Sequence, residues 1–392
     1  MTEEIPTEVV RTVSHGKKPN AITNFFKSMC IIPRVCGTCC VHPCKRALQG
    51  RKRRSWSNRM ELVVATLRTA SKSMPRDPKN LRFWTDRPIP DIILPANAVR
   101  HETTLKTIPV DYVWPRHLTV TDHEIKVSPK SRYTKHDISD ARLLEWSKTH
   151  AIALYLHGGA YMLCSSKTHR AMIYNFVIEG DMVAIAPNYK RVPEGSVVDA
   201  VEDCFSVYRH LISTVGIEPC RICIMGDSAG GALTVLALCR IRDEGVALPA
   251  CAVLLSPWTD LDDKDIQQRA LSKRMPSYDY LPLDAIVMIA AEASGKLDPR
   301  DPRINPMYAD LAGLPPMLVH AGEVEVLLPQ IQLFVERAQV RFNAEIELKV
   351  LSDMIHVGQM FSTFSVIARE AIIEVGAFVH KHIPGTPHHE VM

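Results

Sequence analysis

Short apolar segments alternate with longer segments of mixed polarity over most of the chain beyond residue 150. Continuous apolar runs are typical of buried parallel strands, and apolar positions that recur every three or four residues are typical of the helices that cover them. The pattern predicts strands at 151–156, 182–186, 221–225, 250–255, 317–320 and 346–351. It predicts helices at 169–178, 198–212, 229–241, 326–338 and 366–380.

The region before this alternation has a different pattern. A helix is predicted from Ser55, ended by Pro75, and strands are predicted at 103–105 and 110–114 with a turn at Pro109. Residues 116–148 are polar and charged, so we expect a surface insertion there.

Strand–helix alternation of this kind predicts an α/β fold with a mostly parallel central sheet and helices on both faces. About sixty residues separate the strands ending at Leu255 and starting at Met317, and they include an amphipathic stretch at 283–293. That is too long for an ordinary connection, so an inserted subdomain is expected. The predicted organisation is a basic, cysteine-rich tail at 1–54, a further segment at 55–97, and a main domain at 98–392 with an insertion at about 260–303.

Charge divides the 392-residue chain unevenly. The first 60 residues carry 12 basic and 3 acidic side chains, whereas the rest carries 35 basic and 40 acidic ones. The main domain is therefore slightly acidic, which argues against nucleic acid as a partner. No apolar run reaches the roughly 18 residues of a membrane span, and no signal peptide pattern is seen at the start. The expected location is the cytoplasm.

The tail also holds five of the eleven cysteines, within fifteen residues: Cys30, Cys36, Cys39, Cys40 and Cys44. Beside the basic residues at 45–54 they could form an S-acylated, polybasic attachment, so the tail is a candidate for peripheral membrane contact. Zinc binding by Cys36, Cys39, His42 and Cys44, a nuclear address at 51–54 and an inert tail are the alternatives.

The strongest chemical signal is Gly-Asp-Ser-Ala-Gly at 226–230, between a predicted strand and a predicted helix. A strand that turns sharply into a helix strains the serine backbone and needs glycines on both sides. The turn exposes the hydroxyl of Ser228 at a helix N-terminus, where negative charge is stabilised. Ser228 is the candidate nucleophile.

A second signal, His-Gly-Gly-Ala-Tyr at 157–161, directly follows a predicted strand. Adjacent glycines let two backbone N–H groups point at one spot, as a developing oxyanion requires.

A serine nucleophile needs a base, and the base needs an acid. Downstream of Ser228, His356 is the histidine in a loop at the end of the last predicted strand, the same sheet edge as Ser228. Glu325 follows the strand at 317–320 and is the preferred acid, with Glu323 and Asp353 as rivals.

Together these motifs resemble the hormone-sensitive-lipase family of α/β-hydrolases. So do the segments 188–194 (NYKRVPE), 304–308 (INPMY) and 354–358 (MIHVG), and the resemblance covers about residues 98–382. It implies an α/β-hydrolase fold with a helical cap, which would comprise 55–97 and 260–303, lined by Met275, Tyr278, Tyr280 and Met288. It also implies a triad of Ser228, Glu325 and His356, and an oxyanion hole from the N–H groups of Gly158, Gly159 and Ala229.

Three positions depart from the family pattern. Ala160 replaces the third glycine, Glu325-Val326-Leu327 replaces Asp-Pro-Leu, and Cys164 stands where a small glycine is common. The resemblance implies a serine carboxylic-ester hydrolase acting through an acyl-enzyme on small to medium acyl esters, with no cofactor and no metal in the site. The alternative is a small-molecule receptor on the same fold, although receptors in the family lack the histidine.

Overall fold

The computed structural model describes residues 53–73, 81–82, 85–87, 94–120, 138–262, 277–383 and 385. The predicted tail, except for its last two residues, and Met275 therefore lie outside the described residues.

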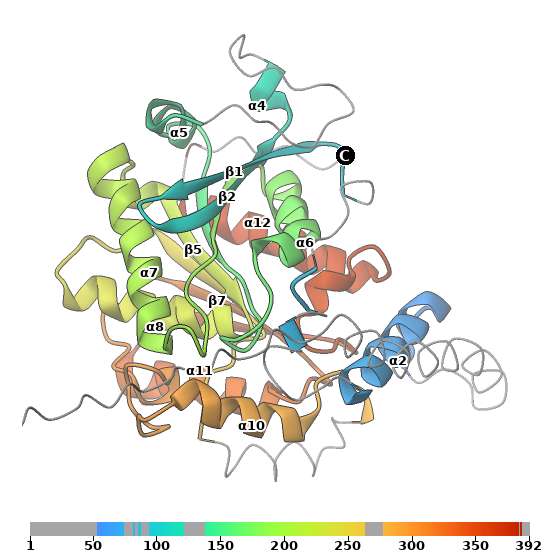
Figure 1. The fold of residues 1–392 in the computed structure, drawn as a ribbon. Coiled ribbons are helices and arrows are strands. Elements are labelled where there is room, and N and C mark those ends of the chain that lie inside the picture. Colours follow the sequence, from blue (N-terminus) through green and yellow to red (C-terminus); the bar gives the residue numbers. More distant parts are fainter. Residues whose placement is uncertain are drawn as a thin grey trace, which may run out of the picture.

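Eight strands form one sheet in the order β1-β2-β4-β3-β5-β6-β7-β8 (Figure 1). Pairing is antiparallel between β1 and β2 and between β2 and β4, and parallel everywhere else in the sheet. The strands are β1 (Ala98–Leu105), β2 (Ile108–Pro115), β3 (Ile152–Leu156), β4 (Val183–Pro187), β5 (Ile222–Asp227), β6 (Cys251–Leu255), β7 (Met317–Gly322) and β8 (Ile346–Leu351). This mostly parallel sheet confirms the predicted fold class.

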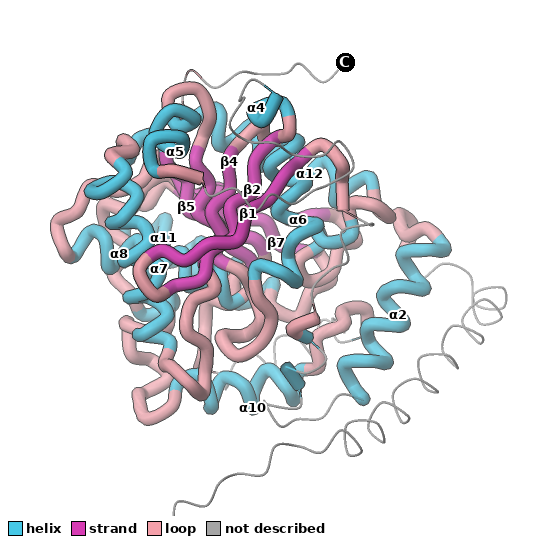
Figure 2. The backbone as a smooth tube through the Cα atoms, turned by 45° about the horizontal axis from the view of Figure 1, so that its top comes forward, coloured by secondary structure: helices cyan, strands magenta, loops and turns pink. Residues whose placement is uncertain are grey.

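Helices cover both faces of the sheet (Figure 2). Alternate strand residues such as Leu154 and Tyr155 point into two separate cores, one beneath α7, α8 and α11 and the other beneath α6 and α12. The helices are α2 (Asn58–Ser73), α4 (His117–Val120), α5 (Asp140–Ser147), α6 (Ser166–Glu179), α7 (Val197–His210), α8 (Ala229–Asp243), α10 (Leu283–Ser294), α11 (Leu328–Phe342) and α12 (Val366–His382). Burial on both faces explains why the inner strands are apolar throughout.

Two expectations about the first 150 residues are wrong. Pro109 lies within β2, and the turn of the β1–β2 hairpin comes earlier, at Lys106, whose φ is 55°. Within 116–148, the described helix α5 is more than a surface insertion, because its Leu143 and Trp146 are buried in the main core. The ring of Trp146 lies 5.4 Å from that of Trp114 on β2.

The two ends of the sheet are covered differently. Helices α4 and α5 lie at one end of the molecule, and α2 and α10 lie at the other (Figures 1 and 2). Buried Trp56, with Met60 and Val64 on α2, packs against Met354 and Ile355 in the loop after β8. The segment at 53–73 therefore supports the carboxyl end of the parallel strands, where the candidate residues lie.

Candidate active site

Ser228 occupies the sharp turn between β5 and α8. Its backbone has φ 54° and ψ −120°, a strained conformation for a residue with a side chain. A Cβ atom at Gly226 would lie 2.4 Å from the carbonyl oxygen of Gly230, and one at Gly230 would lie 2.0 Å from that of Leu156. Both glycines are therefore required for this turn. It presents the Ser228 hydroxyl, which is half-buried, at the N-terminus of α8.

Glu325 and His356 come together at the same sheet edge, after β7 and β8. The Glu325 Oε1 atom lies 3.8 Å from Nδ1 of His356, and both side chains are buried. The other oxygen, Oε2, accepts hydrogen bonds from the Ser256 hydroxyl at 2.5 Å and the Gly322 N–H at 2.8 Å. Two donors thus fix the carboxylate while Oε1 faces the imidazole. In this conformation Ser228 makes no side-chain hydrogen bond to His356 among the described residues, so only two of the three groups face each other closely.

The rival acids point away from His356. Asp353 accepts a hydrogen bond from the Ser55 hydroxyl at 2.9 Å and pairs with Nε of Arg53 at 2.7 Å. Glu323 accepts a hydrogen bond from the N–H of Asp353 at 2.7 Å. Both carboxylates therefore bind the N-terminal segment of the described structure.

The environment of His356 favours its protonated form. Burial acts to lower the pKa of the imidazole, but Glu325 and the more distant carboxylates of Asp279 and Asp227 outweigh it, and the pKa is raised. Such carboxylates stabilise the imidazolium that a histidine becomes when it takes a proton from a nucleophile.

Asp279 is a buried residue of this site that the sequence did not reveal. Its Oδ2 accepts a hydrogen bond from the Val326 N–H at 2.9 Å, and its Oδ1 accepts from the His356 N–H at 3.3 Å and the Tyr280 N–H at 2.8 Å. Burial raises the pKa of Asp279 to about 6. The one available signal was an acidic residue inside the apolar stretch 278–283, and it says nothing about these distant partners.

The loop after β3 corrects one predicted oxyanion donor. The N–H of Gly158 donates to Asp227 at 2.9 Å, so it is directed into the protein and the prediction for this residue is wrong. Among the described residues, no hydrogen bond engages the N–H groups of Gly159, Ala160 or Ala229. Gly159 and Ala160 have φ values of 116° and 53°; glycine adopts such values readily, whereas the value at Ala160 is strained for a residue with a side chain.

Asp227 anchors that loop from beneath. It accepts hydrogen bonds from the Tyr155 hydroxyl at 2.5 Å and from the Gly158 N–H, and its Oδ2 lies 3.2 Å from Nε2 of His169. Burial alone would raise the pKa of Asp227, yet His169 and the hydrogen bonds lower it. These contacts give Asp227 a structural role in holding the loop after β3.

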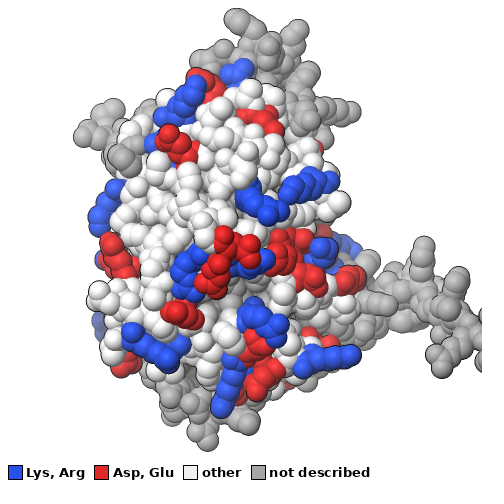
Figure 3. Space-filling model, turned by 90° about the vertical axis from the view of Figure 1, so that its left-hand side faces the viewer, with Lys and Arg blue, Asp and Glu red and all other residues white. Residues whose placement is uncertain are grey.

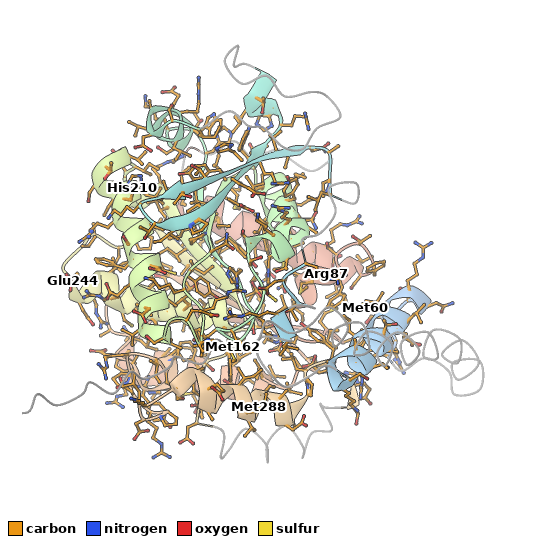
Figure 4. The ribbon with its side chains drawn as sticks, viewed as in Figure 1. Met60, Arg87, Met162, His210, Glu244 and Met288 are labelled. Carbon is orange, nitrogen blue, oxygen red and sulfur yellow. The ribbon has the colours of Figure 1, made fainter. Side chains whose placement is uncertain are left out.

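Of the predicted lining residues, Tyr280 lies close to the base, with its ring 6.1 Å from the imidazole of His356. The ring of Tyr278 instead packs against Arg53, whose guanidinium lies 4.8 Å from the ring centre. Met288 on α10 and Met162 after β3 lie toward the same end of the molecule (Figure 4). Burial raises the pKa of the Cys164 thiol to about 12, so this cysteine stays protonated.

The sequence is similar to those of known proteins. A sequence family described as having the alpha/beta hydrolase fold matches residues 153–360. An acetyl-hydrolase of Streptomyces hygroscopicus is 35% identical over 226 residues, which are 58% of this chain and 74% of that protein. An esterase of Acinetobacter venetianus is 31% identical over 234 residues, with the same two coverages.

Solved structures point the same way. A hormone-sensitive lipase from a metagenome library superposes with a TM-score of 0.66 at 27% identity, covering 82% of this chain and 98% of that one. An esterase/lipase from an uncultured bacterium gives 0.65 at 26% identity, covering 82% and 97%.

Proposed function

Because the chain belongs to the hormone-sensitive-lipase family of α/β-hydrolases, the esterase and lipase type, we propose that it hydrolyses carboxylic esters through an acyl-enzyme on Ser228. The observation that carries this proposal is the arrangement at the carboxyl end of the sheet. A serine in a strained strand–helix turn lies at the same sheet edge as a buried histidine whose Nδ1 faces a fixed carboxylate 3.8 Å away.

The reaction follows from these positions. The Ser228 oxygen attacks the ester carbonyl carbon while Nε2 of His356 takes the hydroxyl proton, and Glu325 stabilises the imidazolium that results. The imidazolium then gives the proton to the leaving alcohol, and the acyl group stays on Ser228. A water molecule then attacks the acyl carbon while Nε2 of His356 takes its proton. The imidazolium returns this proton to the Ser228 oxygen as the acid leaves, which restores the free hydroxyl.

The oxyanion would lie between the loop after β3 and the start of α8. We assign the N–H groups of Gly159, Ala160 and Ala229 to it, because the Gly158 N–H is held by Asp227. Each such donor contributes about 3 to 4 kcal/mol to lowering the barrier in serine hydrolases.

Asp279 is assigned as a positioning residue. Its carboxylate joins the backbone that follows Glu325 to the backbone of His356 itself, so it sets the separation of acid and base. It does so from the insertion at 260–303, which we propose forms the cap together with residues 55–97. Substrates of small to medium acyl length would enter beneath α10 and α2.

A panel of p-nitrophenyl esters of graded acyl length would test both catalysis and pocket size. Turnover that falls beyond medium chain length is expected. A fluorophosphonate probe should label Ser228 and abolish turnover. The Ser228→Ala variant should also lack turnover, and its circular dichroism spectrum should show that it is folded. Saturable ligand binding with no turnover and no labelling would instead support a receptor.

We also propose that residues 1–54 give this enzyme, otherwise expected in the cytoplasm, a peripheral membrane contact. Within the described parts of the chain, no helix combines the length and apolar character that crossing a bilayer requires. On the face shown in Figure 3, basic and acidic side chains of the main domain are interspersed. Attraction to anionic lipid therefore rests on the net charge of the tail, at about 1 kcal/mol for each basic residue near the surface.

Deletion of residues 1–50 tests this contact, because it spares Arg53, which pairs with Asp353 beside the base loop. Full-length protein should fractionate with membranes and be released by hydroxylamine, which cleaves thioesters. The truncated form should be released while keeping its turnover of a short ester. Full-length protein found wholly in the cytosol would contradict the contact.

A further inference from the structure

Three side chains with metal-binding groups gather at the end of the sheet opposite Ser228. His117 lies on α4 after β2, His150 precedes β3, and Asp181 precedes β4. One ligand atom of each lies within 4.8 Å of the other two, and in the described part of the chain this is the only such group. None of the three takes part in the proposed reaction.

The distances lie close to those of a metal site. Nε2 of His117 is 3.5 Å from Oδ1 of Asp181, and Nε2 of His150 is 3.7 Å from Oδ2. Both exceed the length of an ordinary hydrogen bond. Ligands about 2.0 to 2.1 Å from a tetrahedral zinc ion lie about 3.3 Å apart, so the three ligand atoms, which lie within 4.8 Å of one another, would have to move closer together when the ion binds.

The carboxylate between the two imidazoles lacks a complete set of partners. The Asp181 side chain is only 9% exposed, and its Oδ2 makes no hydrogen bond within the described residues. Its backbone has a φ of 41°, a strained value for a residue with a side chain. A buried acceptor without a partner destabilises the fold, and a bound cation would offset that cost.

The ring of His150 places Nε2 beside that carboxylate, so a cation held between the two groups would have a ligand atom on each side. Its Nδ1 lies 2.8 Å from the hydroxyl oxygen of Thr149, and this hydroxyl donates to the carbonyl oxygen of Trp146. The tautomer with its proton on Nδ1, donated to the Thr149 oxygen, leaves Nε2 unprotonated and able to coordinate a cation. Histidine ligands of metals are usually held in this way through their second nitrogen. Burial lowers the pKa of His150, although Asp181 opposes the shift.

We propose that His117, His150 and Asp181 bind a divalent transition-metal ion, with Zn²⁺ as the ion best suited to two imidazoles, one carboxylate and one water. Since His150 and His157 flank the two ends of β3, the ion would lie roughly 20 Å from the oxyanion loop. Its role is therefore structural: it joins α4 to the starts of β3 and β4. The charge of Arg221 acts on His150 and opposes a cation, so binding should be weaker than in a closed four-ligand site.

Measuring the metal content of the full-length chain tests the proposal. The thiols of the tail have to be removed first, because they could bind zinc themselves. The background variant carries serine at each tail cysteine: Cys30, Cys36, Cys39, Cys40 and Cys44. After dialysis against Zn²⁺ and then buffer, elemental analysis should find one equivalent in this background and none after His117→Ala. The matched control is His210→Ala (Figure 4), because His210 faces a single carboxylate, Asp140, at 3.8 Å. That variant should keep the equivalent.

Two further measurements separate this site from the alternatives. With Co²⁺ in place of Zn²⁺, the absorption spectrum should show weak visible bands and no thiolate charge-transfer band. Zn²⁺ should raise the Tm of the background but not of the His117→Ala variant, and the two should have similar Tm values without metal, since the His117 side chain is 54% exposed. Thiolate bands, equal zinc in both proteins, or a Tm that zinc leaves unchanged would overturn the proposal and reduce the cluster to an ion-pair network.

Discussion

Two buried carboxylate–histidine pairs flank Ser228, and they differ in how completely their atoms are bonded. In the pair of Asp227 and His169, the closest atoms are 3.2 Å apart, and Tyr155 and Gly158 also donate to Asp227. In the pair of Glu325 and His356 the closest atoms are 3.8 Å apart. Within the described residues, neither of these two atoms has a hydrogen bond.

The difference separates a structural pair from a pair that can move a proton. The pKa of the histidine is raised in both pairs, although burial acts to lower it. In the first pair the charges are used to hold the loop that carries Gly158. In the second, no hydrogen bond among the described residues engages the ring nitrogens of His356, so Nε2 can take up and release a proton without breaking a structural contact.

The largest effect is expected from the second pair. Glu325→Gln preserves shape but removes the charge that stabilises the imidazolium, so kcat should fall about 10³- to 10⁴-fold. The Tm should change little by comparison. Glu323→Gln is the matched control, because Glu323 faces Asp353 and Arg53, and kcat should stay within a few-fold. Equal losses in the two variants would transfer the role of acid.

Breaking the first pair should affect stability more than proton transfer. His169→Gln leaves Asp227 charged and buried, at a cost of about 3 to 5 kcal/mol in the free energy of unfolding. Because the pKa of His169 is raised in the folded state, the protonated histidine contributes to the free energy of unfolding. This contribution is fully present below about pH 6.5, the ordinary pKa of histidine, and is lost as pH rises through the folded-state pKa. Because the pKa of Asp227 is lowered in the folded state, its carboxylate stabilises the fold above about pH 3.8, the ordinary pKa of aspartate. This contribution is lost as pH falls through the folded-state pKa.

The loss caused by His169→Gln should therefore be greatest between about pH 4 and 6.5, as measured by urea unfolding at several pH values. The midpoint of the pH–kcat/KM profile should not move. A shifted midpoint with unchanged stability would mean that the two pairs have exchanged roles.

Asp279→Asn tests whether the second pair depends on its support. The neutral amide has only one acceptor oxygen in place of the two that together bind three N–H groups, so the spacing of Glu325 and His356 should loosen and kcat should fall about 10- to 100-fold. Removing this carboxylate should also lower the pKa of His356. Asp284→Asn, at an exposed position on α10, is the control. A stability loss without a shift in the pH profile would assign Asp279 a purely structural role.

The smallest effect is the pH dependence of the unaltered enzyme. The base acts as neutral imidazole, and its pKa is raised, so kcat/KM should increase with pH through a midpoint above 6.5 and then level off. Activity is thus lost on the acid side. Initial rates from pH 4.5 to 9 with one soluble ester would measure it, and a profile flat down to pH 4.5 would exclude histidine as the base.

The sequence allowed prediction of features that depend on local pattern. The strands β3 to β8 follow from apolar runs, and the turn at Ser228 follows from the glycines that only such a geometry requires. It could not reveal Asp279, whose partners Val326 and His356 are 47 and 77 positions away. Nor could it show that Asp227 takes the N–H of Gly158, because two adjacent glycines offer equivalent donors until the fold selects one.

The wide separation of Asp279 from its partners has a consequence for how activity is acquired during folding. The groups around the base come from segments after β6, β7 and β8, and Ser228 comes from the end of β5. Parallel pairing closes long loops and is slow, and the site cannot exist before the last of these strands docks. Recovered turnover should therefore lag behind recovered helical signal during refolding, and an intermediate lacking only β8 would be helical and inactive.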